Sequence, residues 1–236
     1  MSKTKEFAYR GVKIQISERN HIHHKNKPVS ERLRDGSYEK GEITLMLSKL
    51  DPNAIVLELG SSLGVLACIV GKNLADSSKM VCVEANPNLL EDLRNNRDIN
   101  DLKFQVIHGA ASSKNYTVDF NFNGLTLGGS IMRKKWLEGD KWGKYDSVTL
   151  ETITPIDIEN KTELKFDTLS CDIEGEELKM LPDMIEYFKN YKLLVIEFHD
   201  WAEKSSRYQH SIRQVHEMYS KYFKIKKFGC VTCFYK

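Results

Sequence analysis

Residues 55–71 read IVLELGSSLGVLACIVG, and this stretch decides the fold. An apolar run over 55–59 leads into a turn that holds Gly60 and Gly64, and an apolar segment of helical character follows. Glycine at 60 permits a tight turn, and glycine at 64 lets a helix begin close to a sheet. The stretch therefore predicts a nucleotide-binding strand, turn and helix.

The spacing of the two glycines bears on the kind of nucleotide. A dinucleotide site expects GxGxxG, and Ser62 stands where the middle glycine makes room for a pyrophosphate. A phosphate-binding loop is also excluded, because Asn73 follows Gly71-Lys72 and no glycine stands five positions earlier. A purely structural strand-to-helix turn remains the alternative.

The next apolar run, KMVCVEANP, ends in Glu84, which lies 24 residues after Gly60. An acid at that strand tip is placed to accept hydrogen bonds from both ribose hydroxyls of an adenosine. Glu84 could instead cap a helix that starts at Pro87, but Asn86 suffices as the cap, so we expect Glu84 to be free for a ligand. With Glu58 available to face a positive charge, the pattern favours a small cationic adenosine ligand.

Short apolar runs alternate with segments of helical period along the rest of the chain, which predicts a mostly parallel sheet with helices on both faces. The last two runs are joined almost directly and predict an antiparallel hairpin at the sheet end. We expect an N-terminal cap or substrate segment over 1–52 and the ligand-binding domain over 53–236. An insertion over 112–166 contains two strand-like stretches, YTVDFNF and SVTLETITPI.

Composition excludes several classes of function. The 236 residues suffice for one sizeable α/β domain, and 35 Lys and Arg against 33 Asp and Glu leave a net charge of +2, which does not point to nucleic acid. No apolar run is long enough to cross a bilayer. Five cysteines, three of them inside apolar runs, suit a reducing, cytoplasmic compartment. The oligomeric state stays open.

Residues 170–178, SCDIEGEEL, hold four carboxylates within six residues. Gly175 breaks the chain, so Glu176 and Glu177 fall in a first helical turn, where the helix dipole favours exposed acids by ~0.3–1 kcal/mol each. Asp172 and Glu174 precede that helix, at the carboxyl edge where α/β sheets bind ligands, and are candidates for function. His199 ends the run LLVIEFH at the same edge.

These motifs together resemble the FkbM-type methyltransferases, which share the class I methyltransferase core. The resemblance rests on ELGSSLG (58–64), VEANP (83–87), SYEKGE (37–42) and above all on SCDIEGEELKML (170–181), with VIEFH (195–199) after it. It implies a Rossmann-like sheet of about seven strands and S-adenosyl-L-methionine as the cofactor. It also implies methyl transfer, usually to a hydroxyl oxygen of a sugar, polyketide or related natural product.

The resemblance implies roles for individual residues. Glu58, Gly60 and Gly64 would flank the methionine moiety, Glu84 would hold the ribose, and Ala110 or Ala111 would lie beside the adenine. Asp172 and Glu174 would face the transferred methyl group. The full expected cofactor set is Glu58, Gly60, Ser61, Ser62, Gly64, Glu84, Ala85, Ala110, Ala111 and Asp172.

A hydroxyl acceptor needs a base, for which we rank Asp172, Glu174 and His199 in that order. Tyr38, Glu39 and Glu42 are expected near the substrate, as are Trp136 and Trp142 of a basic-aromatic patch. We expect no metal, although oxygen and imidazole ligands from Asp172, Glu197 and His199 would suit magnesium or manganese.

The sequence thus predicts an S-adenosylmethionine-dependent O-methyltransferase that acts on a small-molecule or glycan hydroxyl. The D/N-P-P-Y/F motif of enzymes that methylate flipped bases is absent, which counts against a nucleic-acid substrate. An NAD-dependent oxidoreductase and a non-catalytic adenosine-ligand binder are the alternatives from other classes.

Overall fold

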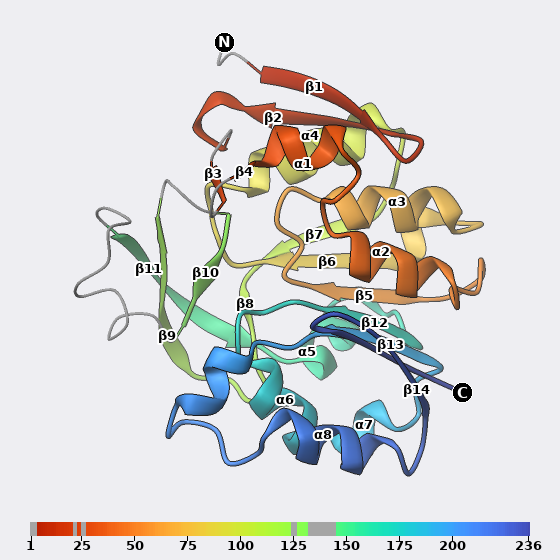
Figure 1. Ribbon diagram of the computed structural model, residues 1–236, viewed down its shortest axis with the longest axis vertical. Coiled ribbons are helices and arrows are strands. Elements are labelled where there is room, and N and C mark those ends of the chain that lie inside the picture. Colours follow the sequence, from red (N-terminus) through yellow and green to blue (C-terminus); the bar gives the residue numbers. More distant parts are fainter. Residues whose placement is uncertain (1–3, 21–22, 25–26, 124–126, 132–144) are drawn as a thin grey trace.

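The computed structural model describes residues 4–20, 23–24, 27–123, 127–131 and 145–236, and its centre is a seven-stranded sheet (Figure 1). Five neighbouring strands pair in parallel, and the last two strands of the chain form an antiparallel hairpin, of which the final strand pairs antiparallel with β13 (Leu193–Glu197). Across the sheet the order is β14 (Lys224–Phe228), β15 (Val231–Tyr235), β13, β12 (Thr168–Cys171), β5 (Val56–Leu59), β6 (Met80–Glu84) and β7 (Gln105–His108). The predicted fold class and hairpin are confirmed.

Helices cover both faces of this sheet (Figure 1). Successive side chains of a strand point to opposite faces, so Val56 of β5 joins one buried apolar cluster and Leu57 joins the other. On the first face lie α2 (Lys40–Leu47), α3 (Val65–Asn73) and α4 (Leu90–Ile99). On the second lie α5 (Pro155–Thr162), α6 (Glu177–Asp183), α7 (Ile185–Phe188) and α8 (Ile212–Tyr219).

Two predicted helices differ in their bounds. The helix expected from Pro87 begins at Leu90, because the Asn86 side chain and carbonyl accept the backbone N–H groups of Asn88 and Leu89 and form a turn first. The helix expected to begin at Glu176 is divided into α6 and α7. Pro182 lies within α6, where it has no N–H to donate and shortens the helix.

The N-terminal segment is attached to the outer face of the first helical layer. Strands β1 (Thr4–Tyr9) and β2 (Val12–Ser17) form a hairpin, and β2 lies on α4. The chain continues through η1 (Glu18–Asn20), β3 (His23–His24), β4 (Lys27–Pro28) and α1 (Val29–Arg34) to reach α2. The division of the chain at residue 52 stays a prediction.

Buried polar side chains of α4 connect the hairpin to the sheet layer. The fully buried Asn96 accepts the Gln15 N–H at 2.6 Å and donates to the carbonyls of Gln15 and Leu63 at 3.0 and 2.9 Å. Asn100 makes the same two-way contact with the backbone of Lys13.

We expect Asn96→Ala to lower the free energy of unfolding by about 2–4 kcal/mol, because three backbone groups, one buried and two partly buried, lose their partner. Urea denaturation measures the loss, with Asn190→Ala as the control, since Asn190 is exposed and makes one bond within its own turn. Equal stability of the two variants would contradict a structural role for this contact.

The insertion strands form a second, four-stranded sheet together with β8 (Ala110–Ala111), in the order β10 (Gly129–Ser130), β9 (Thr117–Asn123), β11 (Tyr145–Ile153) and β8. Both strand-like stretches of the insertion are confirmed, as β9 and β11. Short 3-10 turns complete the fold at η2 (Ser77–Lys79) and η4 (Asp200–Lys204). Within the described residues, no helix has the length and apolar character that crossing a membrane requires.

Candidate active site

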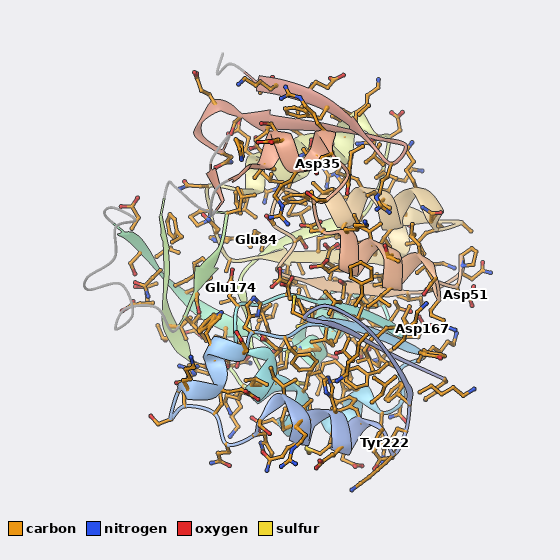
Figure 2. The ribbon with its side chains drawn as sticks, viewed as in Figure 1. Asp35, Asp51, Glu84, Asp167, Glu174 and Tyr222 are labelled. Atoms are coloured by element: carbon orange, nitrogen blue, oxygen red, sulfur yellow. The ribbon has the colours of Figure 1, made fainter. Side chains whose placement is uncertain are left out.

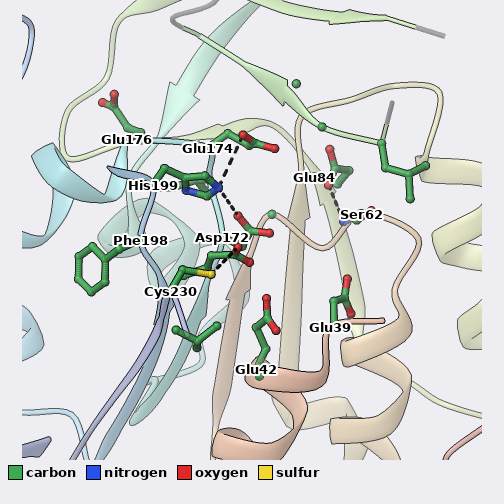
Figure 3. Close-up of a pocket in the computed structure, with 18 of the residues that line it drawn as sticks. Glu39, Glu42, Ser62, Glu84, Asp172, Glu174, Glu176, Phe198, His199 and Cys230 are labelled. Atoms are coloured by element: carbon green, nitrogen blue, oxygen red, sulfur yellow. Dashed lines mark hydrogen bonds and ion pairs between the residues drawn. The ribbon is translucent and has the colours of Figure 1, made fainter. Parts of the chain in front are cut away.

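A cavity of about 700 Å³ opens at the carboxyl ends of β5, β6, β12 and β13 (Figure 3). The insertion strands, the start of α2 and the β14–β15 turn complete its wall. Ligands of open α/β sheets bind at this edge, where the strand order changes direction between β5 and β12. The cavity is therefore the candidate active site.

The glycine turn forms the floor on the side of β5. Gly60 has a φ of +81°, and a Cβ placed there would lie 1.7 Å from the Asp172 carbonyl oxygen. A Cβ at Gly64, where φ is +77°, would lie 2.4 Å from Leu93 Cδ1. Both positions require glycine, one for the approach of the loop after β12 and the other for the packing of α3 on α4.

Glu84, at the tip of β6, ties this turn in place. Its Oε2 accepts the Ser62 N–H and its Oε1 accepts the Asn86 N–H, each at 2.7 Å. Glu84 thus accepts two backbone N–H groups, while each carboxylate oxygen keeps a second lone pair for a ligand, and its role toward a ligand stays a prediction. Burial raises the pKa of Glu84 to about 7.

The cavity brings together most of the predicted site residues. Those that line it are Tyr38, Glu39, Glu42, Gly60, Ser62, Glu84, Ala85, Ala110, Ala111, Asp172, Glu174 and His199. The predicted cofactor residues Glu58, Ser61 and Gly64 are buried or lie behind the turn and are not part of the lining. Trp136 and Trp142 lie outside the described residues.

Glu58 differs from its expected role. It is 3% exposed, its Oε2 accepts from the Cys82 thiol at 3.6 Å, and burial holds the pKa of its carboxyl well above the usual range. Burial disfavours the charged form of this carboxyl. The placement thus gives no support to Glu58 as a partner for a positive charge.

His199 meets two acids of the DIEG segment at the edge of the cavity (Figure 3). Its Nε2 lies 3.6 Å from Asp172 Oδ1 and 3.7 Å from Glu174 Oε2, and its side chain is 13% exposed. Burial disfavours the imidazolium, but the hydrogen bond to Glu177 and the surrounding carboxylates outweigh it and raise the pKa of His199 to about 10. Burial also holds the pKa of Asp172 well above its usual range.

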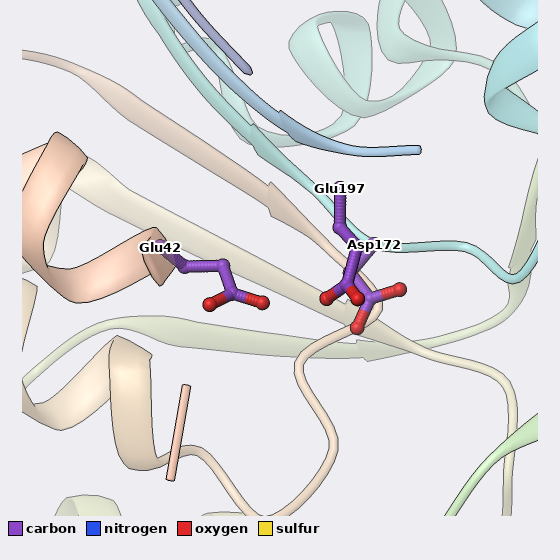
Figure 4. Close-up of side chains that lie close together, drawn as sticks. All are labelled: Glu42, Asp172 and Glu197. Atoms are coloured by element: carbon purple, nitrogen blue, oxygen red, sulfur yellow. The ribbon is translucent and has the colours of Figure 1, made fainter. Parts of the chain in front are cut away.

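Glu42, Asp172 and Glu197 form a second cluster, in which carboxyl oxygens lie within 4.8 Å of one another (Figure 4). Burial and a hydrogen bond with Glu197 raise the pKa of Glu42 to about 10. Burial works against the Glu197 carboxylate too, yet the bond from Glu42 and the charge of His199 lower its pKa. Glu42 therefore holds a proton that it donates to Glu197. The distances between these three carboxyl groups would admit a divalent cation. The proton shared by Glu42 and Glu197 explains their close approach equally well.

Several lining residues were missed by the sequence reasoning. Trp201, two residues past His199, lines the cavity with its ring centroid 5.7 Å from that of His199. Arg32 of α1 and Cys230 of the β14–β15 turn also line it, and the Cys230 thiol donates to Glu197 at 3.2 Å. The position of Trp201 just past a strand end was a usable signal. Arg32 and Cys230 reach the cavity only through tertiary packing.

Comparison with known proteins identifies a family that matches most of this chain. A family model described as Methyltransferase FkbM domain matches residues 64–222, well over half of the chain. The Hexuronic acid methyltransferase AglP of Haloferax volcanii is 25% identical over 170 residues, which make up 71% of this chain and 65% of that protein. The match thus spans less than two thirds of that relative.

Two solved structures are similar at low identity. The SAM-dependent methyltransferase from Agrobacterium tumefaciens has a TM-score of 0.49 and 12% identity, and the alignment covers 92% of this chain and 57% of that one. The O-methyltransferase from Bacillus cereus in complex with SAH has a TM-score of 0.44 and 16% identity, covering 83% and 80%. At these TM-scores the two likenesses carry no functional argument.

Proposed function

This chain belongs to the FkbM methyltransferase family, and on that premise we propose that it methylates a hydroxyl oxygen of a sugar or glycan. Its activity is methyl transfer and its cofactor is S-adenosyl-L-methionine. The observation that carries the proposal is a carboxylate-lined cavity above a glycine turn, at the edge of the sheet where ligands bind.

The charge of the cavity fits this cofactor. Its carboxyl side chains in the described part of the chain are Glu39, Glu42, Glu84, Asp172, Glu174, Glu176, Glu197 and Asp200, against the basic Arg32, Lys40 and His199. Such a lining suits a cationic ligand and opposes the pyrophosphate of NAD. The sulfonium of S-adenosylmethionine supplies an electrophilic methyl group when it is bound.

The glycine turn and Asp172 fit the cofactor in shape and polarity. Gly60 lets the loop after β12 approach the turn, which brings Asp172 to the cavity, and Glu84 offers two acceptor oxygens to a ribose. Asp172 Oδ1 is buried and has no hydrogen-bond partner among the described residues, as expected of an atom that faces a ligand.

The remaining catalytic work is orientation and proton removal. Methyl transfer from a sulfonium is an in-line displacement, so holding the acceptor oxygen opposite the methyl group accounts for most of the acceleration. Asp172, Glu174 and His199 lie at the same edge of the cavity and are the side chains we assign to the acceptor proton.

A sugar acceptor is supported by the chemistry of the lining and by the relative. Carboxylates accept hydrogen bonds from sugar hydroxyls, and Trp201 offers an aromatic face beside His199. The relative from Haloferax volcanii is named as a hexuronic acid methyltransferase. A hydroxyl on a sugar accounts for both the acceptor-rich wall and the aromatic ring.

Titration calorimetry tests the cofactor, with S-adenosylhomocysteine and NADH as the two probes. We expect binding of S-adenosylhomocysteine at micromolar concentration, about −8 kcal/mol, and no heat with NADH. Binding of NADH alone would support the oxidoreductase alternative and contradict the proposal.

A panel of acceptors with isotope-labelled S-adenosylmethionine tests the chemistry. Neutral methyl glycosides, uronates and amino sugars are the members, and NMR of the labelled methyl group distinguishes O-, N- and C-methylation. Label on oxygen of a sugar is the expected result. Label on nitrogen or carbon, or none with any sugar while the cofactor binds, would overturn the acceptor assignment.

A further inference from the structure

Glu177 was expected to be an exposed acid at a helix start, and it does lie in the first turn of α6, but it is buried. It is 0% exposed, and its carboxylate accepts three hydrogen bonds. Oε2 accepts the Gly175 N–H at 2.9 Å, whereas Oε1 accepts the backbone N–H of His199 at 3.1 Å and its Nδ1–H at 3.0 Å. One buried side chain thus links the DIEG segment to the end of β13.

These contacts determine which nitrogen of His199 is available. Because a carboxylate has no hydrogen to donate, Nδ1 must carry a proton, and His199 is held by two bonds to the same oxygen, one from its backbone N–H and one from its ring. Nε2 is then directed into the cavity, close to Asp172 and Glu174 (Figure 3). The bound carboxylate sets both the tautomer and the orientation of the imidazole.

The charges that face His199 come from every element packed on it. Glu177 belongs to α6, Asp172 and Glu174 to the segment after β12, and Glu197 to β13 itself. The Trp201 ring of η4 lies edge-on to the imidazole at 5.7 Å. The acids raise the pKa of His199 to about 10, so in the ligand-free protein the imidazole is protonated at neutral pH, and the group of His199, Asp172 and Glu174 accepts a further proton through its carboxylates.

The neighbouring Glu176 is also buried but has different hydrogen-bond partners, so it is a matched control for Glu177. It is 1% exposed, and its carboxylate accepts from Ser112, Tyr116 and Tyr208 at 2.6, 2.9 and 3.1 Å. Arg207 adds an ion pair at 3.3 Å. Glu176 therefore joins the insertion to the chain after η4, and its bonds within the described part of the chain do not reach His199.

We propose that Glu177 is a positioning residue, which holds His199 with Nε2 between Asp172 and Glu174 so that this group takes up the proton that the acceptor loses. The inference rests on the proposed methyl transfer to a hydroxyl. In that step the carbon–sulfur bond breaks, a carbon–oxygen bond forms, and the hydroxyl proton passes to the group that His199, Asp172 and Glu174 form. The sulfur keeps the electron pair of the broken bond.

NMR of the imidazole nitrogens in the full chain tests this without an acceptor. We expect a far-downfield, slowly exchanging Nδ1 proton, assigned to His199 by its loss in His199→Gln. Glu177→Gln is expected to lower the pKa of His199 by about one pH unit or more, because a buried negative charge is removed. Glu176→Gln serves as the matched control, for which a lower melting temperature and an unchanged His199 titration are expected.

Each outcome decides the inference. An exchange-protected Nδ1 proton that disappears in Glu177→Gln supports it. A wild-type His199 whose Nδ1 carries no proton at neutral pH overturns it even where Glu177→Gln does not fold. An equal shift of the His199 pKa in Glu176→Gln would show a general effect of burial and also overturn it.

Different experiments test the proposed function and this inference, so either one can be contradicted without the other. Calorimetry with S-adenosylhomocysteine tests the former, whereas the His199 signals report the Glu177 contact whether or not the cofactor binds. With an acceptor in hand, Glu177→Gln is expected to lower kcat about tenfold with little change in KM, and to move the pH profile with the pKa of His199.

Discussion

Replacing Gly60 by alanine is expected to weaken S-adenosylhomocysteine binding by at least about 100-fold, the largest effect of any single substitution considered. The new Cβ would lie 1.7 Å from the Asp172 carbonyl oxygen, and this neighbour is backbone that cannot rotate away. Either the turn or the segment after β12 must move, and both line the cavity. Calorimetry and thermal unfolding measure the two consequences.

Gly11→Ala is the matched control. Gly11 has a φ of +86°, close to the +81° of Gly60, but a Cβ there would meet nothing within 4 Å. Alanine at position 11 is expected to cost only the strain of a left-handed backbone, about 1–2 kcal/mol, and to leave cofactor binding intact. Equal effects at positions 11 and 60 would show that backbone strain, rather than the close approach of Asp172, explains Gly60.

Glu84→Ala is expected to weaken S-adenosylhomocysteine binding about 100-fold, because charge-assisted hydrogen bonds to the ribose are lost and the Ser62 N–H loses its acceptor. Glu84 has its pKa raised to about 7, and ribose hydroxyls need the ionised form as an acceptor. The dissociation constant should therefore rise as the pH falls below 7, approaching about tenfold per pH unit.

A second buried acid provides the control for this pH dependence. Burial also raises the pKa of Glu39 to about 7, and its carboxylate accepts the Leu66 N–H at 3.1 Å. Binding that loses its pH dependence in Glu84→Gln and keeps it in Glu39→Gln assigns the effect to Glu84. The reverse pattern would move the assignment to Glu39 and contradict the ribose role of Glu84.

The fold could be predicted from local pattern because each strand and helix of the sheet layer has its own apolar period. Residues 55–71 alone specify β5, the glycine turn and α3, and burial of both strand faces explains their continuous apolar run. The bounds of α4 and α6 could not be read this way. Asn86 and Pro182 shift them through turn geometry and a missing N–H rather than through periodicity.

The site was predictable where residues follow strand ends in sequence. Glu84, Asp172 and His199 each come at or just after the carboxyl end of a parallel strand, so one edge of the sheet must collect them. The sequence did not show that both oxygens of Glu84 already accept backbone N–H groups, or that Glu58 lies outside the cavity lining.

From the sequence alone follow the α/β class, the glycine turn and the family, because these depend on short-range spacing and on residue types at strand ends. Only the tertiary structure decided the roles of the acids in DIEGEE. Glu177 is 22 residues away from His199 along the chain, and packing of α6 under the end of β13 buries the two together. The same packing raises the pKa of His199, since charges buried at short range interact far more strongly than charges in water.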